Sequence, residues 1–152
     1  MRALVTGGAI RLGREIALYL GEQGFDVAVH YAASADAARA TASEIEAIGQ
    51  KSVALQADLL DEEQSQSLVS RAVDALGGSL SLLVNNASIF EHDTIDTATR
   101  SSWDRHMESN LRAPFVLTQE FAKQAPEYKL DEMNEPMAQA LVINMLDQRV
   151  RK

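Results

Sequence analysis

The chain contains no cysteine, which excludes disulfide bonds, thiolate catalysis and cysteine-ligated zinc. No apolar run approaches the length of a membrane span, and the N-terminus lacks the pattern of a signal peptide because its first apolar run is short. The 14 basic residues are outnumbered by 22 acidic ones, and the resulting net charge of -8 opposes general nucleic-acid binding while leaving a local anion pocket allowed. We therefore expect a cytoplasmic protein that binds neither nucleic acid nor a membrane.

A metal site and a repeat architecture are also not indicated. The three histidines, His30, His92 and His106, lie in unrelated segments, and no H-E-x-x-H motif occurs, which disfavours a metal-dependent hydrolase. Neither internal repeats nor low-complexity tracts are present. Hydrophobic residues make up 46% of 152 residues, an ordinary value for a globular protein. We expect a single domain over residues 1–152 with no metal.

A glycine-rich loop, Thr6–Gly13, follows the short apolar run Ala3–Val5 and opens onto an amphipathic stretch that begins at Arg14. This pattern predicts a strand, a tight turn and the start of a helix. Unpaired backbone N–H groups at such a helix start favour an anion such as a pyrophosphate. The spacing departs from G-x-G-x-x-G because Arg11 stands where a middle glycine would be expected. A glycine-rich turn that holds no ligand is the alternative.

The rest of the chain alternates β-branched apolar runs with amphipathic stretches. We expect further strands at 27–29, 52–55, 80–84 and 140–146, with helices at 14–24, 35–48, 61–76, 103–107 and 111–125. Residues 125–138 contain two prolines and several charges, which predict a surface loop with room for a short helical turn. Alternating strands and helices imply right-handed crossovers and a parallel sheet covered on both faces. The predicted fold is a doubly wound α/β domain.

Polar side chains follow the expected strands at their carboxyl ends, where open α/β sheets bind ligands. These positions are the glycine loop, His30 to Ser34, Ala57 to Leu59, Asn85 to Ser88, and Asp147. Taken singly, each has an ordinary structural explanation: Asp58 can cap a loop, Asn86 can serve a turn, and His30 can be a satisfied half-buried histidine. Their convergence on one edge of the sheet indicates a binding site.

Taken together, these residues resemble the short-chain dehydrogenase/reductase family over essentially the whole chain. The resemblance implies a Rossmann sheet, with about five of the family's seven strands present, and an oxidoreductase that binds a nicotinamide cofactor. Four motifs match in order: Thr6-Gly7 with Gly13 as the glycine motif, Asp58 as the adenine-contacting acid, Asn85-Asn86-Ala87 as the N-N-A motif, and Asn110 as the structural and proton-relay asparagine.

Within the family, the chain looks like the pteridine reductase branch, on the strength of Arg11, of Phe90 after Asn86-Ala87-Ser88, and of Asp147 where a serine is usual. This implies reduction of a pterin C=N bond, with Arg11, Ser88 and Phe90 binding the substrate. It implies catalytic roles for Asn110 and Asp147. From the residues alone, Phe90 could equally be a residue at the lip of the core, and Asp147 a cap on the following segment. A flat heteroaromatic ring stacked on Phe90 would gain from offset π contact.

The expected cofactor is NADP(H). Sites for NAD usually place an acid near the end of the second strand, and no acid occurs in residues 30–34 of this chain. Ser34 and the helix after it can accept a 2′-phosphate, helped by His30 or Arg11. The expected cofactor-binding residues are Thr6, Gly7, Arg11, Leu12, Gly13, His30, Tyr31, Ser34, Ala57, Asp58, Leu59, Asn86, Ala87 and Ser88.

The chain departs from the family in lacking its Y-x-x-x-K pair, since Tyr19, Tyr31 and Tyr128 have no lysine at the required spacing. We expect this chain to be the N-terminal, cofactor-binding part of a longer reductase, inactive alone and prone to associate through an apolar edge at 140–146. Two other functions stay open: an NADP(H)-binding module or sensor without catalysis, and a short-chain reductase that acts on a carbonyl. The resemblance also implies a small-molecule substrate and a homo-oligomer formed through helix 111–125.

Overall fold

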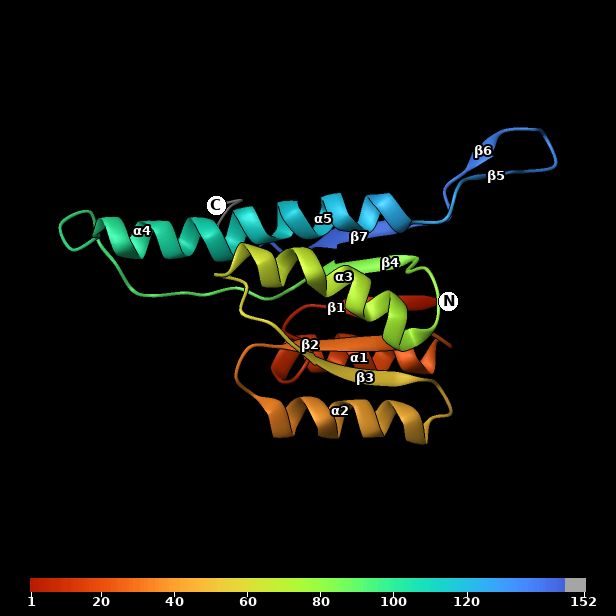
Figure 1. The fold of residues 1–152 in the computed structure, drawn as a ribbon, viewed down its shortest axis with the longest axis horizontal. Coiled ribbons are helices and arrows are strands. Elements are labelled where there is room, and N and C mark those ends of the chain that lie inside the picture. Colours follow the sequence, from red (N-terminus) through yellow and green to blue (C-terminus); the bar gives the residue numbers. More distant parts are fainter. Residues whose placement is uncertain (147–152) are drawn as a thin grey trace.

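The computed structural model describes residues 1–146, which form a five-stranded parallel sheet in the order β3-β2-β1-β4-β7 (Figure 1). The strands are β1 (Arg2–Val5), β2 (Asp26–Tyr31), β3 (Ser52–Gln56), β4 (Leu82–Asn85) and β7 (Leu141–Asn144). The strand order reverses between β1 and β4, because the chain leaves β3 at one edge and re-enters the sheet beside β1. The expected doubly wound α/β fold is confirmed.

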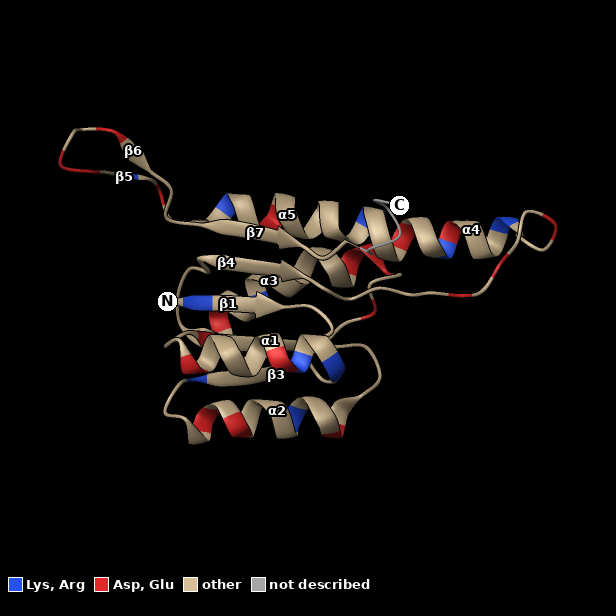
Figure 2. Cartoon of the chain, turned by 180° about the vertical axis from the view of Figure 1, so that it is seen from behind, with Lys and Arg blue, Asp and Glu red and all other residues tan. Residues whose placement is uncertain are grey.

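Helices cover both faces of the sheet (Figures 1 and 2). Helices α1 (Arg11–Glu22) and α2 (Ala35–Ala47) pack on the face that presents Ala3 and Val5 of β1. Helices α3 (Glu62–Leu76) and α5 (Ala113–Gln124) pack on the face that presents Leu4. Since all three of these consecutive side chains are fully buried, β1 is a continuous apolar run rather than an alternating one.

The helix boundaries differ from the expected ones at two functional positions. Helix α1 begins at Arg11 rather than Arg14, so the last residues of the glycine loop, Arg11–Gly13, belong to the first turn of the helix. The expected helix 111–125 is preceded by a π-helical turn, Glu108–Arg112, which joins α4 (Arg100–Met107) to α5. Few helices contain a π turn, and those turns often lie at functional sites. The π turn of this chain carries Asn110.

The segment between α5 and β7 is not the loop with a helical turn that the sequence indicated. Strands β5 (Lys129–Leu130) and β6 (Pro136–Met137) pair as an antiparallel hairpin that projects from the body of the domain (Figure 1). Its turn is closed by Asp131, whose Oδ1 accepts from the N–H groups of Met133 and Glu135. Acidic residues gather on this hairpin (Figure 2).

Strand β7 lies at the edge of the sheet, as expected for the last apolar run. It pairs with β4, and no other strand among residues 1–146 pairs with its outer side. Leu141 and Ile143 remain 57% and 39% exposed. This exposure agrees with the expected apolar edge, whereas association through it stays a prediction. None of the helices in the described residues is long and apolar enough to cross a membrane.

Candidate functional site

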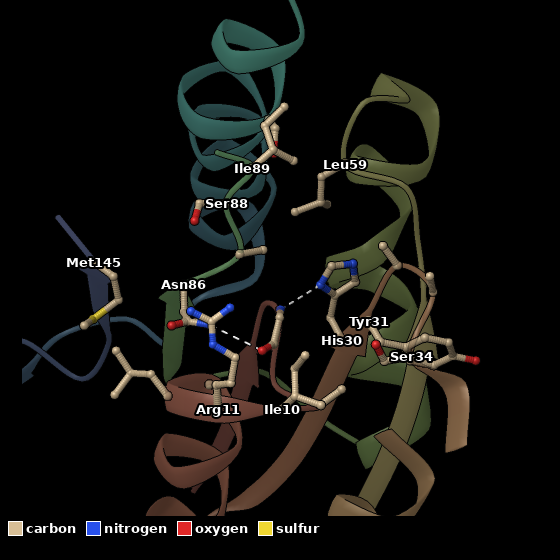
Figure 3. Close-up of a pocket in the computed structure, with 18 of the residues that line it drawn as sticks. Ile10, Arg11, His30, Tyr31, Ser34, Leu59, Asn86, Ser88, Ile89 and Met145 are labelled. Carbon is tan, nitrogen blue, oxygen red and sulfur yellow. Dashed lines mark hydrogen bonds between the residues drawn. The ribbon is translucent and has the colours of Figure 1, made fainter. Parts of the chain in front are cut away.

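A cavity of about 670 Å³ opens at the carboxyl ends of β1, β2 and β4, beside the point where the strand order reverses. Figure 3 shows Met145 and Asn86 on one side of it and Tyr31 and Ser34 on the other. The expected cofactor-binding residues that line the cavity are Gly7, Arg11, Leu12, Gly13, His30, Tyr31, Ser34, Asp58, Leu59, Asn86, Ala87 and Ser88. The structure thus brings together residues from four separate stretches of the chain.

The glycine loop is held in a conformation that depends on its residue types. Gly7 has a φ of 63°, and a Cβ added to Gly13 would lie 2.1 Å from the Gly7 carbonyl oxygen. Arg11 also has a positive φ, 54°, so it adopts the left-handed backbone that a glycine would take at lower cost. The backbone therefore follows the path of a glycine loop at Arg11, although the residue carries a guanidinium into the lining of the cavity.

Thr6 and Asn86 lock the end of β1 to the end of β4. The Thr6 hydroxyl donates to the Val84 carbonyl and accepts from the N–H groups of Asn86 and Ala87. The Asn86 amide in turn donates to the carbonyl oxygens of Thr6 and Gly7, at 2.9 and 3.3 Å. Thr6 is buried beneath the loop and does not line the cavity, and its hydrogen bonds hold the loop in place.

His30 lies at the floor of the cavity and is only 1% exposed. Its Nδ1 accepts from the Gly7 N–H, and its Nε2 bonds to the carbonyl of Ala57, each at 3.1 Å. Burial lowers the pKa of His30 to about 4. The ring is therefore neutral near pH 7 and both of its nitrogens are bonded within the protein, as in the satisfied histidine that the sequence offered as one interpretation.

The end of β2 carries no acid, as the sequence indicated. Tyr31, Ala32, Ala33 and Ser34 line the cavity, and the first acid after them, Asp36, lies in the first turn of α2. Ser34 is the residue before α2, and in the described part of the chain its side chain makes no bond to the first turn of that helix. The hydroxyl and the helix start are thus placed together at the cavity.

Asp58 serves both as a loop residue and as part of the lining. Its Oδ1 accepts from the N–H of Leu60, and its own N–H donates to the Gln64 side chain. The bond to Gln64 connects the end of β3 to α3, whose first turn is capped by Asp61 through the Gln64 N–H. Ala57, immediately before Asp58, is fully buried and does not line the cavity.

Only some of the residues that were assigned to substrate binding and catalysis lie in the lining of the cavity. Asn110 bonds the backbone of Ile89 through both ends of its amide, at 2.9 Å each, so it holds the segment that follows the N-N-A motif. Phe90 is 73% exposed and is not among the residues that line the cavity. Asp147 lies outside the described residues. Of this group, Arg11 and Ser88 line the cavity.

Some lining residues were not among the expected cofactor-binding or substrate-binding residues, although four of them belong to stretches that the sequence placed at the site. These lining residues are Ala9, Ile10, Ala32, Ala33, Leu60, Ile89, Ser109, Met145 and Leu146. Most of them adjoin an expected motif, so proximity in sequence could have suggested them, whereas Met145 and Leu146 reach the cavity because β7 pairs with β4. Over residues 1–146, no group of three or more His, Cys, Asp or Glu side chains is placed to hold a metal ion.

Comparison with known proteins decides the family. The sequence matches the short chain dehydrogenase family over residues 1–129. The chain belongs to this family. It is 38% identical, over 122 residues and 80% of its length, to the 3-oxoacyl-[acyl-carrier-protein] reductase FabG of Staphylococcus aureus, of which it covers 49%. The short-chain dehydrogenase fold thus accounts for the strand order, the glycine loop and the N-N-A motif described above.

Solved structures agree with this assignment. FolM alternative dihydrofolate reductase 1 from Brucella suis, in complex with NADP, superposes with a TM-score of 0.86 at 38% identity, covering 98% of this chain and 58% of that one. A short chain dehydrogenase from Burkholderia cenocepacia, also with NADP, gives 0.80 at 41% identity, covering 83% and 51%. Both structures contain the cofactor that the sequence indicated. The chain spans about half the length of the curated relatives it matches.

Proposed function

We propose that this chain is the cofactor-binding part of an NADPH-dependent short-chain oxidoreductase. The observation that carries the proposal is the cavity at the strand-order reversal, lined by the glycine loop, an acid-free end of β2 and Asp58. The crowding around Gly13 supports the fit, because only a glycine there lets the start of α1 pack this closely against Gly7 and Asn86, which places the helix start at the cavity. The bound nicotinamide would supply hydride.

The chain's own residues divide the work of binding. The backbone of the loop and the start of α1 face the pyrophosphate. Ser34 and the start of α2 take the 2′-phosphate, which the uncharged segment 31–33 does not repel. Asp58 lies where the adenine end would rest, on the far side of His30 from the loop. Arg11 adds planar donors on the side of the cavity nearest Asn86 (Figure 3).

For the whole protein, we propose a pterin or a related heteroaromatic compound as the substrate. The similarity to FolM from Brucella suis supports it, as do Arg11 and Ser88 in the cavity lining. Phe90 follows the segment that Asn110 holds, and we assign it the stacking role once substrate is bound. Asp147 would orient a proton donor. The similarity to FabG favours a carbonyl substrate as the second candidate.

The substrate class is tested on the full-length protein with dihydrobiopterin and with a simple ketone. Pterin should be reduced in preference, and Phe90→Ala should raise its KM about fivefold because a stacked aromatic contact is lost. Asp147→Ala and Asp147→Ser should lower kcat. Tyr128→Ala, which removes an exposed aromatic that does not line the cavity, is the matched control. Reduction of the ketone alone, or unchanged pterin turnover in all variants, would refute the pterin assignment.

We also propose a homo-oligomer formed through α4 and α5. Four apolar residues recur at every fourth position along α4, the π turn and α5: Trp103, Met107, Leu111 and Phe115, which are 62%, 39%, 59% and 52% exposed. The last three line a shallow depression together with Asp104, Glu108 and Arg112. Such an apolar stripe bordered by charges of both signs is typical of a helix–helix interface between subunits.

A further inference from the structure

One buried side chain joins the ends of three adjacent strands. His30 lies at the end of β2, and its ring reaches Gly7 after β1 through Nδ1 and Ala57 after β3 through Nε2. Its own carbonyl accepts from the N–H of Gly8 at 2.9 Å. The first two glycines of the loop are therefore both bonded to this single residue, whose ring is labelled in Figure 3.

These partners fix the protonation of the ring. The Gly7 N–H can only donate, so Nδ1 must carry a lone pair, and the Ala57 carbonyl can only accept, so Nε2 must carry the proton. The titratable and charged groups that act on the ring are Arg71 and Asp58, whose charges have opposite effects, while burial disfavours the charged form most. The arrangement requires the neutral tautomer with hydrogen on Nε2.

The Gly7 peptide is consequently held from two sides. His30 accepts from its N–H, and the Asn86 amide donates to its carbonyl. Gly7 has a φ of 63°. Because it is a glycine, its backbone could take other conformations unless its polar groups are fixed. On the other side of the ring, Ala57 directly precedes Asp58. The imidazole thus bridges the glycine loop and the residue before Asp58.

We propose that His30 is a positioning residue, a neutral clasp that sets the spacing between the glycine loop and Asp58 and so preorganises the dinucleotide site. This inference rests on the proposed cofactor function. A ring that merely filled the core could be replaced by an apolar residue of similar size, whereas the clasp requires an acceptor at Nδ1. An orphaned buried N–H is costlier than an under-satisfied carbonyl, so the bond from Gly7 should matter more than the bond to Ala57.

Three substitutions separate the two bonds. In His30→Asn, the side-chain oxygen can take the place of Nδ1 and keep the Gly7 acceptor. In His30→Gln, the longer amide can take the place of Nε2 and keep only the donor to Ala57, and His30→Leu keeps neither. His92→Gln, at an exposed position outside the cavity, is the matched control.

The dissociation constant for NADPH is measured by titration calorimetry on each variant of the 152-residue chain, and Gly7 amide exchange is followed by NMR. We expect His30→Asn to raise the dissociation constant no more than about threefold, and His30→Gln and His30→Leu to raise it about tenfold or more. Gly7 exchange should accelerate in the last two variants and stay slow in His30→Asn. If His30→Leu does not fold, the Asn and Gln pair decides.

Equal binding by all three variants, or equal loss with unchanged Gly7 exchange, overturns the clasp and leaves His30 a core residue. The wild type could bind no NADPH while the protection of the Gly7 amide from exchange still decreases from the wild type through His30→Asn to His30→Gln. In that case the clasp stands and the proposed cofactor function fails. Slow exchange at Gly7 in His30→Gln contradicts the clasp whatever the cofactor result. The two proposals therefore fail by different measurements.

Discussion

Gly13 has no room for a side chain. A Cβ there would lie 2.1 Å from the Gly7 oxygen and 2.5 Å from the Asn86 amide nitrogen, both of which are fixed by other bonds. Gly13→Ala should therefore displace the loop, destabilise the chain by about 2 kcal/mol and abolish NADPH binding. Gly78→Ala is the control, because its Cβ would meet only the end of the flexible Arg2 side chain. Urea unfolding and calorimetry measure both effects, and wild-type binding by Gly13→Ala would contradict them.

The burial of His30 predicts how stability depends on pH. Its pKa falls from 6.5 to about 4 on folding, so the folded chain binds the proton less readily than the unfolded chain. The stability that depends on a neutral His30 is therefore fully present above pH 6.5 and is lost as the pH falls toward 4. In total, this loss lowers the free energy of unfolding by about 3 kcal/mol. Between pH 7 and 4.5, urea unfolding of the wild type should lose about 2 kcal/mol more than that of His30→Asn, which cannot titrate there. Equal losses in the two proteins would show that His30 is not the group responsible.

Sequence motifs located most of the cavity lining but not the direction of each side chain. Gly7, Gly13, Asp58 and Asn86 were identified because their spacing follows the ends of expected strands. The burial of Thr6 and the inward bonds of His30 depend on strand register and on neighbouring backbone groups, which periodicity does not specify. For the same reason, the sequence left open whether His30 helps to bind a phosphate or is a satisfied buried histidine, and the bonds of both ring nitrogens agree with the second interpretation.

Among the elements, the strands and the first three helices were predicted to within a few residues, because buried β-branched runs and glycine stops are strong local signals. The π turn at Glu108–Arg112 was missed, since a single inserted residue leaves the helical periodicity almost unchanged. The hairpin β5–β6 was missed because its strands have two residues each and face solvent, so no apolar alternation marks them.

The exposed stripe on α4 and α5 predicts subunit contacts. Leu111→Glu places a charge in the middle of it and should shift the wild-type oligomer toward monomer by at least tenfold in dissociation constant, because a carboxylate that is buried in an apolar contact loses its hydration. Sedimentation equilibrium measures the shift. Met133→Glu, at the 83%-exposed tip of the hairpin, should leave association unchanged. A monomeric wild type, or a larger effect from Met133→Glu, would contradict this interface.

In the part of the molecule that the structure describes, the reversal of strand order creates a cavity at the carboxyl ends of the strands. The distribution of charged residues leaves the lining at the end of β2 free of acids. Although the formal charge is -8, the segment that ends β2 carries no acid, and acidic residues lie on the hairpin and along the outer helices (Figure 2). A 2′-phosphate placed at Ser34 would therefore meet a hydroxyl and a helix start, and the first carboxylate beyond them is that of Asp36 in the first turn of α2.

The preference for NADPH over NADH, measured by titration calorimetry on the 152-residue chain, tests this account most directly. We expect NADPH to bind at least about tenfold more tightly, because the 2′-phosphate gains charge-assisted hydrogen bonds at Ser34 and the start of α2. Ala33→Asp should reverse the preference, since a carboxylate accepts from a free 2′-hydroxyl and repels the phosphate. Tighter binding of NADH by the wild type, or no change in preference on Ala33→Asp, would contradict the account.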